Sequence, residues 1–158
     1  MNNIYTYNVN INWLEGRKGL MESSALNDKI EVATPPGFAG GIPGIWSPEH
    51  LFVAAAASCF MTTFLAVAEK SRLDFLAFSC KASGTLETIN NQMLINSITL
   101  QPTLKIADDD MLDKGLKVLG IAHKSCLILN SMKSEIIFIS HILCDNRTPL
   151  VNDESHNL

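Results

Sequence analysis

Residues 47–70, SPEHLFVAAAASCFMTTFLAVAEK, form the most regular stretch of this chain. Serine is a preferred helix N-cap and proline is tolerated in the first helical turn, so Ser47 and Pro48 predict a helix that begins here and runs to about Ser71. Between residues 51 and 67 the side chains are almost all apolar. Because a helix that is apolar on every side is buried on every side, we expect this one at the centre of the fold.

The length of the chain limits how such a helix can be enclosed. A chain of 158 residues is expected to form one domain, whose modest sheets can barely cover more than about 20 residues of helix. The alanines at residues 54–57 permit the close approach of a second helix. We therefore expect a homodimer with this helix in a shared core. The alternative is a monomer in which two sheets sandwich the helix.

Patterns typical of strands flank this helix on both sides. Residues 4–13 alternate between apolar or aromatic side chains and Asn or Thr, which predicts a half-buried strand. We expect the further elements as short strands at residues 20–25 and 29–33, long strands at 76–87 and 93–105, a second helix at 108–125 and a last strand at 135–144. The order βββ-α-ββ-α-β, with short turns, favours antiparallel pairing. It predicts an α+β fold of antiparallel sheets packed around the central helix.

The composition is that of a globular protein and argues against some classes of partner. Apolar residues make up 47% of the chain and charged residues 18%, and the net charge of −4 comes from interspersed acids and bases. Without a basic patch, we expect neither nucleic acid nor a membrane as a partner. We assign residues 1–145 to a single domain and residues 146–158 to a polar tail. The N-terminus shows no signal-peptide pattern, so we expect a cytoplasmic location.

Four cysteines are the first candidates for chemistry: Cys59, Cys80, Cys126 and Cys144. None belongs to a CxxC pair, so we expect no metal site. Cys80 and Cys144 each lie in an expected strand, and we interpret them as structural residues.

Cys59 lies in the middle of the long helix and is either a small buried hydrophobe or a reactive thiol. Burial keeps a thiol protonated, so a thiolate here needs a cation from another segment, and turnover as a peroxidase needs a second thiol. Arg17, on the glycine-flanked turn at residues 16–19, can supply the cation, and Cys126, directly after the second helix, can supply the thiol. The alternative is that Arg17 is solvated and Cys126 belongs to the core.

Apolar side chains in and beside a long loop are candidates for a substrate pocket. Residues 34–46, TPPGFAGGIPGIW, form a loop of the length that tends to carry function. The side chains that we expect to wall a pocket for an alkyl chain are Phe38, Ile42, Ile45, Trp46, Phe52 and Phe60. For Phe52 and Phe60, a place in the core is an equally good interpretation.

Three motifs resemble those of a known superfamily. Residues 47–52, followed by an alanine-rich helix and Cys59, resemble the Asn-Pro-Glu-x-Leu segment and peroxidatic cysteine of the OsmC/Ohr superfamily. This superfamily comprises osmotically inducible protein C and the organic hydroperoxide resistance proteins. Residues 16–19 are similar to its Gly-Arg-Asp-Gly turn, and residues 122–126 are similar to the run that carries its second cysteine. The resemblance covers roughly residues 5–144.

The resemblance implies a thiol peroxidase that needs no cofactor and folds as an intertwined α+β homodimer. The site residues that it implies are Cys59 as peroxidatic thiolate, Cys126 as resolving thiol, Arg17 as stabiliser of the thiolate and Glu49 as the residue that orients Arg17. It also implies organic or lipid hydroperoxides as substrates. The reductant is expected to be a thiol, for which lipoyl groups are one candidate.

Two features keep alternatives open. Leu127 stands where the superfamily usually has proline after its second cysteine. The alternatives are therefore a binding module of the same fold for a small apolar ligand, with redox-silent cysteines, or a stress protein that uses one cysteine only.

Glu49 and Cys59 lie ten residues apart, roughly 15 Å along a helix axis. We expect the partner chain to supply Glu49; otherwise Arg17 spans the gap or the helix breaks.

Overall fold

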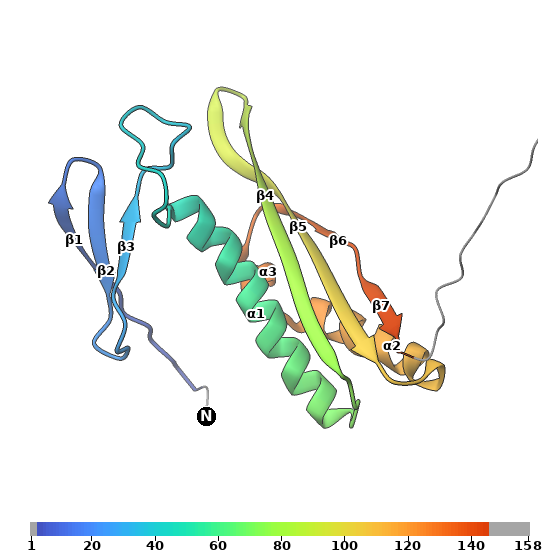
Figure 1. The fold of residues 1–158 in the computed structure, drawn as a ribbon. Helices are drawn as coiled ribbons and strands as arrows, with labels where there is room; N and C mark the ends of the chain where they lie inside the picture. The colour runs from blue at the N-terminus through green and yellow to red at the C-terminus, as the bar shows by residue number, and fades with distance from the viewer. Residues whose placement is uncertain (1–2, 146–158) are drawn as a thin grey trace, which may run out of the picture. The chain divides into compact units, whose positions relative to one another are not determined.

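The computed structural model describes residues 3–145 and shows an α+β protein. The chain divides into two compact units, one up to Ala54 and one from Ala55 (Figure 1). Whether residues 1–145 act as a single domain stays a prediction. The predicted polar tail at residues 146–158 lies outside the described residues.

The first unit is built on an antiparallel sheet of three strands in the order β1-β2-β3. The strands are β1 (Asn10–Glu15), β2 (Lys18–Glu22) and β3 (Ile30–Ala33). The strand predicted at residues 4–13 is a strand only from Asn10. Its apolar side chains are exposed and not half-buried, and Trp13 is 75% exposed. The alternating pattern therefore marks a face that one chain leaves uncovered.

The long helix α1 (Pro48–Lys70) begins where the sequence predicts. The backbone N–H of His50 donates to Ser47 Oγ at 3.2 Å, so Ser47 satisfies one of the amides that a helix N-terminus leaves without a partner. The buried residues recur every fourth position, at Ala56, Phe60, Phe64 and Ala68.

The predicted burial of α1 on every side is not found within one chain. Met61 and Leu65, on another side of the helix, are 40% and 42% exposed. By length and composition α1 is also apolar enough to cross a membrane, a test that the core helix of a water-soluble protein passes as well.

The second unit contains a mixed sheet of four strands. The long hairpin of β4 (Ala77–Ile89) and β5 (Gln92–Ile106) turns through Asn90 and Asn91, both with positive φ, as the sequence predicts (Figure 1). The last strand differs from the prediction. It consists of two strands, β6 (Glu135–Phe138) and β7 (His141–Cys144), and both pair with β5 in parallel.

Two physical reasons explain this difference. The chain returns to the sheet through helices, and such a crossover permits parallel pairing, which a short turn does not. Pro102 lies in β5 between the residues that pair with β6 and those that pair with β7. Because proline has no N–H, it interrupts the ladder of hydrogen bonds there.

The core of the second unit lies between this sheet and its helices. Every second residue of β5 from Ile98 to Ile106 is buried. On α1, the ring of Phe64 stacks on that of Phe78 of β4, with 4.3 Å between their centroids. The predicted second helix is observed as a short 3₁₀ turn, η1 (Asp109–Met111), followed by α2 (Leu112–Ser125). A third helix, α3 (Leu127–Ser131), was not predicted, because five residues are too few to show a helical period.

Candidate functional site

The structure brings Cys59 and Cys126 together within the second unit. Cys59 lies half-buried in the middle of α1, and Cys126 is fully buried between α2 and α3. The side chain of Cys126 makes a hydrogen bond to that of Cys59. Neither thiol is in a disulfide. The two cysteines that the sequence singled out are thus adjacent, although 67 positions separate them in the chain.

The junction of α2 and α3 supplies further donors to the same sulfur. Cys126 has an extended backbone, with φ of −70° and ψ of 109°, and it serves as N-cap of α3 without a side-chain capping bond. The first amides of a helix have no partner inside the helix. Here the backbone N–H groups of Leu127 and Ile128 make hydrogen bonds to the Cys59 sulfur.

The balance of these contacts lowers the pKa of Cys59. Burial, the largest single effect, raises this pKa because it disfavours the charged thiolate. Hydrogen bonds from Cys126, Ile128, Thr63 and Leu127 act in the opposite direction and together outweigh burial. The thiolate of Cys59 is therefore favoured relative to an ordinary cysteine, and neutral donors within the second unit contribute to this.

Cys126 has the opposite character. Burial raises the pKa of its thiol, and the adjacent Cys59 raises it further by charge and by hydrogen bonding. These opposite shifts favour a thiolate at Cys59 that accepts a hydrogen bond from a protonated Cys126 over the reverse arrangement. In this arrangement the Cys59 sulfur is the nucleophile, and the Cys126 sulfur stays protonated and less reactive.

Thr63 contacts Cys59 from the next turn of α1. Its Oγ1 lies 4.0 Å from Cys59 Sγ. Neither Thr63 nor the two backbone amides was identified from the sequence. The spacing of four residues between Cys59 and Thr63 on a predicted helix is a signal that could have indicated the threonine. The two amides belong to the backbone, so no residue type in the sequence indicates them.

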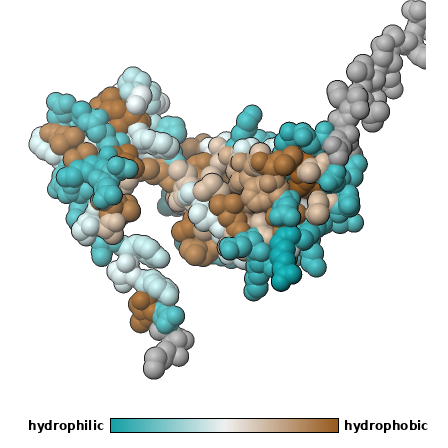
Figure 2. Space-filling view, turned by 60° about the horizontal axis from the view of Figure 1, so that its bottom comes forward, coloured by the Kyte–Doolittle hydropathy of each residue, from teal (hydrophilic) through white to brown (hydrophobic). Residues whose placement is uncertain are grey.

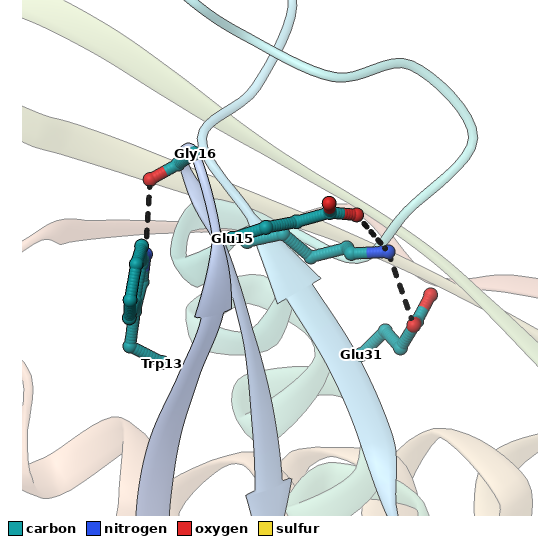
Figure 3. A network of polar contacts seen from close by, with 5 residues as sticks. Trp13, Glu15, Gly16 and Glu31 are labelled. Carbon is teal, nitrogen blue, oxygen red and sulfur yellow. Dashed lines mark hydrogen bonds and ion pairs between the residues drawn. The ribbon is translucent and has the colours of Figure 1, made fainter.

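Arg17 lies in the first unit, on a turn whose neighbouring residues make a hydrogen bond and two ion pairs. Trp13 Nε1 donates to the carbonyl of Gly16 at 3.2 Å, and Lys18 bridges Glu15 and Glu31 at 3.4 Å each (Figure 3). Glu31, followed by Glu15, raises the pKa of Lys18. Within residues 3–145, Lys18 is thus engaged by carboxylates, whereas no carboxylate pairs with Arg17.

The side chain of Arg17 packs against the loop that follows β3. A Cβ built on Gly40 would lie 3.2 Å from Arg17 Cγ, so a side chain at this position would require the Arg17 stem to shift by a few tenths of an ångström. Arg17 also lines a pocket of about 400 Å³, together with Trp13, Val32 and Pro48. The arginine therefore borders a cavity in the first unit that has both apolar and cationic walls.

Glu49 lies in the first turn of α1 and has a carboxylate oxygen without a partner. Its Oε2 is buried and makes no hydrogen bond within the described part of the chain. A buried carboxylate oxygen of this kind is costly unless a cation or a donor meets it. The helix is unbroken from Pro48 to Lys70, so Glu49 and Cys59 stay ten residues apart on one helix.

The predicted pocket residues fall into separate groups. Ile45 and Trp46 line a pocket of about 300 Å³ with His50, whose ring meets that of Trp46 edge to face. The others in the first unit are Phe38, which is 38% exposed, Ile42 and Phe52. Phe60 is fully buried against Phe78 and Phe138, the core position that was its alternative. Within residues 3–145, no group of three His, Cys, Asp or Glu side chains is placed to hold a metal ion.

Comparison with known proteins gives one family and a set of similar structures. The family model of OsmC-like proteins matches residues 41–140. No curated protein matches the chain. Among solved structures, an OsmC-like protein of unknown function from Vibrio cholerae has a TM-score of 0.77 and 22% identity over 87% of this chain and 99% of that one.

Two further structures are of organic hydroperoxide resistance proteins. The protein from Elizabethkingia anophelis has a TM-score of 0.71 and 20% identity over 92% of this chain and 100% of that one. The protein OhrB of Bacillus subtilis has a TM-score of 0.66 and 20% identity over 87% of this chain and 98% of that one. At these identities the likeness shows a shared fold.

Proposed function

Since the chain belongs to the OsmC-like protein family, we propose that it is a thiol peroxidase that reduces organic hydroperoxides. Its fold is that of the OsmC/Ohr proteins, among which are proteins of organic hydroperoxide resistance. The observation that carries the proposal is the hydrogen-bonded pair of Cys59 and Cys126, in which the partly accessible sulfur has the lowered pKa.

The proposed reaction has three steps. The Cys59 thiolate attacks the terminal oxygen of R–O–OH; an S–O bond forms, the O–O bond breaks, and the alkoxide takes up a proton and leaves as R–OH. The sulfenic acid is then attacked by the Cys126 thiol; an S–S bond forms, and the hydroxyl group leaves with the thiol proton as water. A dithiol reductant, for which lipoyl groups are one candidate, reduces the disulfide to two thiols and becomes a disulfide itself.

Arg17 and Glu49 have a supporting part in this proposal. A guanidinium can stabilise a thiolate and donate to the peroxide oxygens, which a point charge cannot do with the same geometry. The absence of a carboxylate partner for Arg17 and the orphaned Oε2 of Glu49, both within the described residues, support a site completed by further groups. We propose that Glu49 from a partner chain orients Arg17.

A homodimer is part of the same proposal. The surface of each unit carries hydrophobic side chains (brown in Figure 2). Large apolar residues are exposed along residues 4–13 and on α1, where Phe52, Met61 and Leu65 are exposed. Surfaces of this kind are typical of protein interfaces. A second copy would cover the apolar faces that the sequence pattern marks for burial.

The substrate proposal rests on the apolar walls of the first unit. Ile45 and Trp46 border one pocket, and Trp13 and Val32 border the pocket that also contains Arg17. Such walls suit the alkyl part of a hydroperoxide, while the guanidinium suits its oxygen atoms. Phe38, Ile42 and Phe52 remain candidates for the same wall.

A count of free thiols tests the proposed function. The reduced protein is treated with one equivalent of cumene hydroperoxide, and its thiols are counted with Ellman's reagent before and after. We expect the loss of two thiols, with a Cys59–Cys126 disulfide found by peptide mass spectrometry. Cys59→Ser should lose none, and Cys126→Ser should stop at a sulfenic acid that dimedone traps.

The matched control for this experiment is Cys80→Ser. Cys80 is a second half-buried cysteine of the same unit, but the pKa of its thiol is raised by burial. This variant should still lose two thiols. If the protein without substitutions keeps all its thiols after the hydroperoxide, the result would contradict the peroxidase and leave a redox-silent binding protein. Loss of one thiol would point to a protein that uses Cys59 alone.

A further inference from the structure

Thr63 contacts the sulfur of Cys59 from one turn further along α1. The distance between Thr63 Oγ1 and Cys59 Sγ is 4.0 Å, within the range of hydrogen bonds to sulfur. Residues four positions apart on a helix lie on the same face, so this contact follows from the spacing and not from a chance side-chain position. Both side chains are half-buried, so solvent competes only partly for the hydroxyl group.

The neighbouring threonine shows that the contact belongs to Thr63 specifically. A helical threonine commonly donates its hydroxyl to a backbone carbonyl of the preceding turn. Thr62 does so, with its Oγ1 3.0 Å from the carbonyl oxygen of Cys59. The hydroxyl group of Thr63 instead makes its hydrogen bond with the sulfur, in which either atom can be the donor. The two threonines thus differ in hydrogen-bond partner while they share residue type and helix, with Thr62 exposed and Thr63 half-buried.

The other donors to this sulfur have different fates during the proposed reaction. The Cys126 thiol loses its proton when the disulfide forms, and the amides of Leu127 and Ile128 are fixed by the backbone of α3. Thr63 is the side-chain donor on the same helix as the nucleophile, and no step of the reaction changes it. A thiolate has no proton to give, so in that state the hydroxyl must be the donor.

We propose that Thr63 is a positioning residue, whose hydroxyl donates to the Cys59 thiolate and holds the sulfur in the rotamer that faces Cys126. This inference rests on the proposed peroxidase function. The contact would also stabilise the charge that makes the sulfur a nucleophile, together with the amides of Leu127 and Ile128. Cys126 is the titratable residue outside α1 that shifts the pKa of Cys59.

The test compares Thr63→Val with the matched control Thr62→Val. Valine keeps the branched shape and removes the hydroxyl, so each variant deletes one hydrogen bond with little change in packing. The first measurement is the pH dependence of Cys59 alkylation by iodoacetamide, followed on the Cys59 peptide by mass spectrometry. The second is the rate of Cys59 oxidation by cumene hydroperoxide in a single turnover. Thermal melts check that each variant is folded.

We expect Thr63→Val to move the midpoint of alkylation to higher pH and to slow oxidation at pH 7 by about three- to tenfold. Thr63→Ser, which restores a hydroxyl, should bring both values back toward those of the starting protein. Thr62→Val should leave both unchanged. A merely structural role for Thr63 would lower the melting temperature without moving the midpoint. If Thr63→Val does not fold, Thr63→Ala removes the same hydroxyl and gives the same comparison.

The proposal is overturned if Thr63→Val alkylates with the midpoint of the starting protein, or if Thr62→Val moves the midpoint by the same amount. Failure of the proposed function gives a different result. In that case Cys59 of the starting protein is not oxidised by the hydroperoxide, while the midpoint still differs between Thr63→Val and its control.

Discussion

At the scale of single residues, the reactive sulfur is surrounded by neutral hydrogen-bond donors. Burial by itself would keep Cys59 protonated, but a thiol, a hydroxyl and two backbone amides reverse that effect. Hydrogen bonds to a charged group are stronger than those between neutral groups, and they gain further in a partly buried site. A mid-helix cysteine can therefore form a thiolate without the help of its own helix N-terminus.

The first prediction concerns the pH profile of Cys59. Because its pKa is lowered, the thiolate persists below the pH at which an ordinary cysteine is protonated, and alkylation should fall only as the pH drops through that lowered value. Cys80, whose pKa burial raises, should reach its maximal rate at higher pH. Peptide-resolved alkylation across pH 5–10 measures both thiols in one sample. Identical alkylation midpoints for Cys59 and Cys80 would contradict a lowered pKa of Cys59.

The second prediction concerns the residue that follows Cys126. In Leu127→Pro the backbone N–H that bonds to the Cys59 sulfur is lost, while proline remains compatible with the first position of a helix. The pKa of Cys59 should rise, and its oxidation at pH 7 should slow by about two- to threefold, less than in Thr63→Val, because the Leu127 amide makes the smallest of these contributions.

The control for this change is Leu127→Ala, which shortens an exposed side chain and keeps the N–H. It should preserve both the alkylation midpoint and the oxidation rate. Equal behaviour of the proline and alanine variants would mean that the Leu127 amide contributes nothing to the thiolate.

At the scale of elements, the loop between β3 and α1 depends on a close backbone approach. Phe38 N–H donates to the carbonyl of Pro35, Gly41 N–H to that of Phe38, and Ile42 N–H to that of Thr34, at 2.9–3.0 Å. These bonds fold the loop back on itself. The loop is therefore an ordered part of the first unit, in spite of its glycines and prolines.

The third prediction tests this loop with Gly41→Ala. A Cβ at this position would lie 2.1 Å from the carbonyl oxygen of Pro35, so the backbone must shift. We expect a loss of about 1–3 kcal/mol in the free energy of unfolding. Urea unfolding is followed by tryptophan fluorescence, because both tryptophans, Trp13 and Trp46, lie in the first unit.

Gly37→Ala is the matched control in the same loop. Its added Cβ would meet no atom within 4 Å. This variant should unfold within about 0.5 kcal/mol of the starting protein, as surface substitutions usually do. A similar loss for both glycines would show that the close approach at Gly41 is not the cause.

At the scale of the whole molecule, one chain leaves uncovered the surfaces that its sequence marks for burial. Ile11 and Trp13 are 59% and 75% exposed, on the apolar side of an alternating strand, and α1 exposes Met61 and Leu65. The hydrophobic effect favours removing such area from water. A second copy of the chain can bury this apolar area, so that no partner of another sequence is needed to cover it.

The fourth prediction is that the protein is a homodimer in solution. Light scattering after size exclusion should give about twice the 17.3 kDa of one chain. Ile11→Lys places a charge on the apolar side of β1 and should weaken association by roughly thirtyfold or more. Asn10→Lys, one residue away on the other side of the strand, should not. A monomer that is fully active would contradict both the dimer and the supply of Glu49 from a partner.

Much of the fold could be predicted because its signals are local. The cap at Ser47, the long helix, the turn at Asn90 and Asn91, and the two long strands depend on residues that are neighbours in sequence. The approach of Cys126 to Cys59 could be anticipated only from the motifs of a family. Arg17 and Glu49 belong to the first unit and Cys59 belongs to the second, so the roles of these two residues at the Cys59 sulfur remain predictions.

The sequence by itself determined the helices and strands whose capping, turns and periodicity lie within a few residues, and it marked Cys59 and Cys126 as the thiols of interest. Only the tertiary structure decided the parallel pairing of β6 and β7 with β5, the short helix α3, and the amides and hydroxyl that meet the Cys59 sulfur. The physical reason is that backbone donors are the same at every position except proline. Which of them meets a given sulfur depends on how distant segments pack, and no pattern of side chains records it.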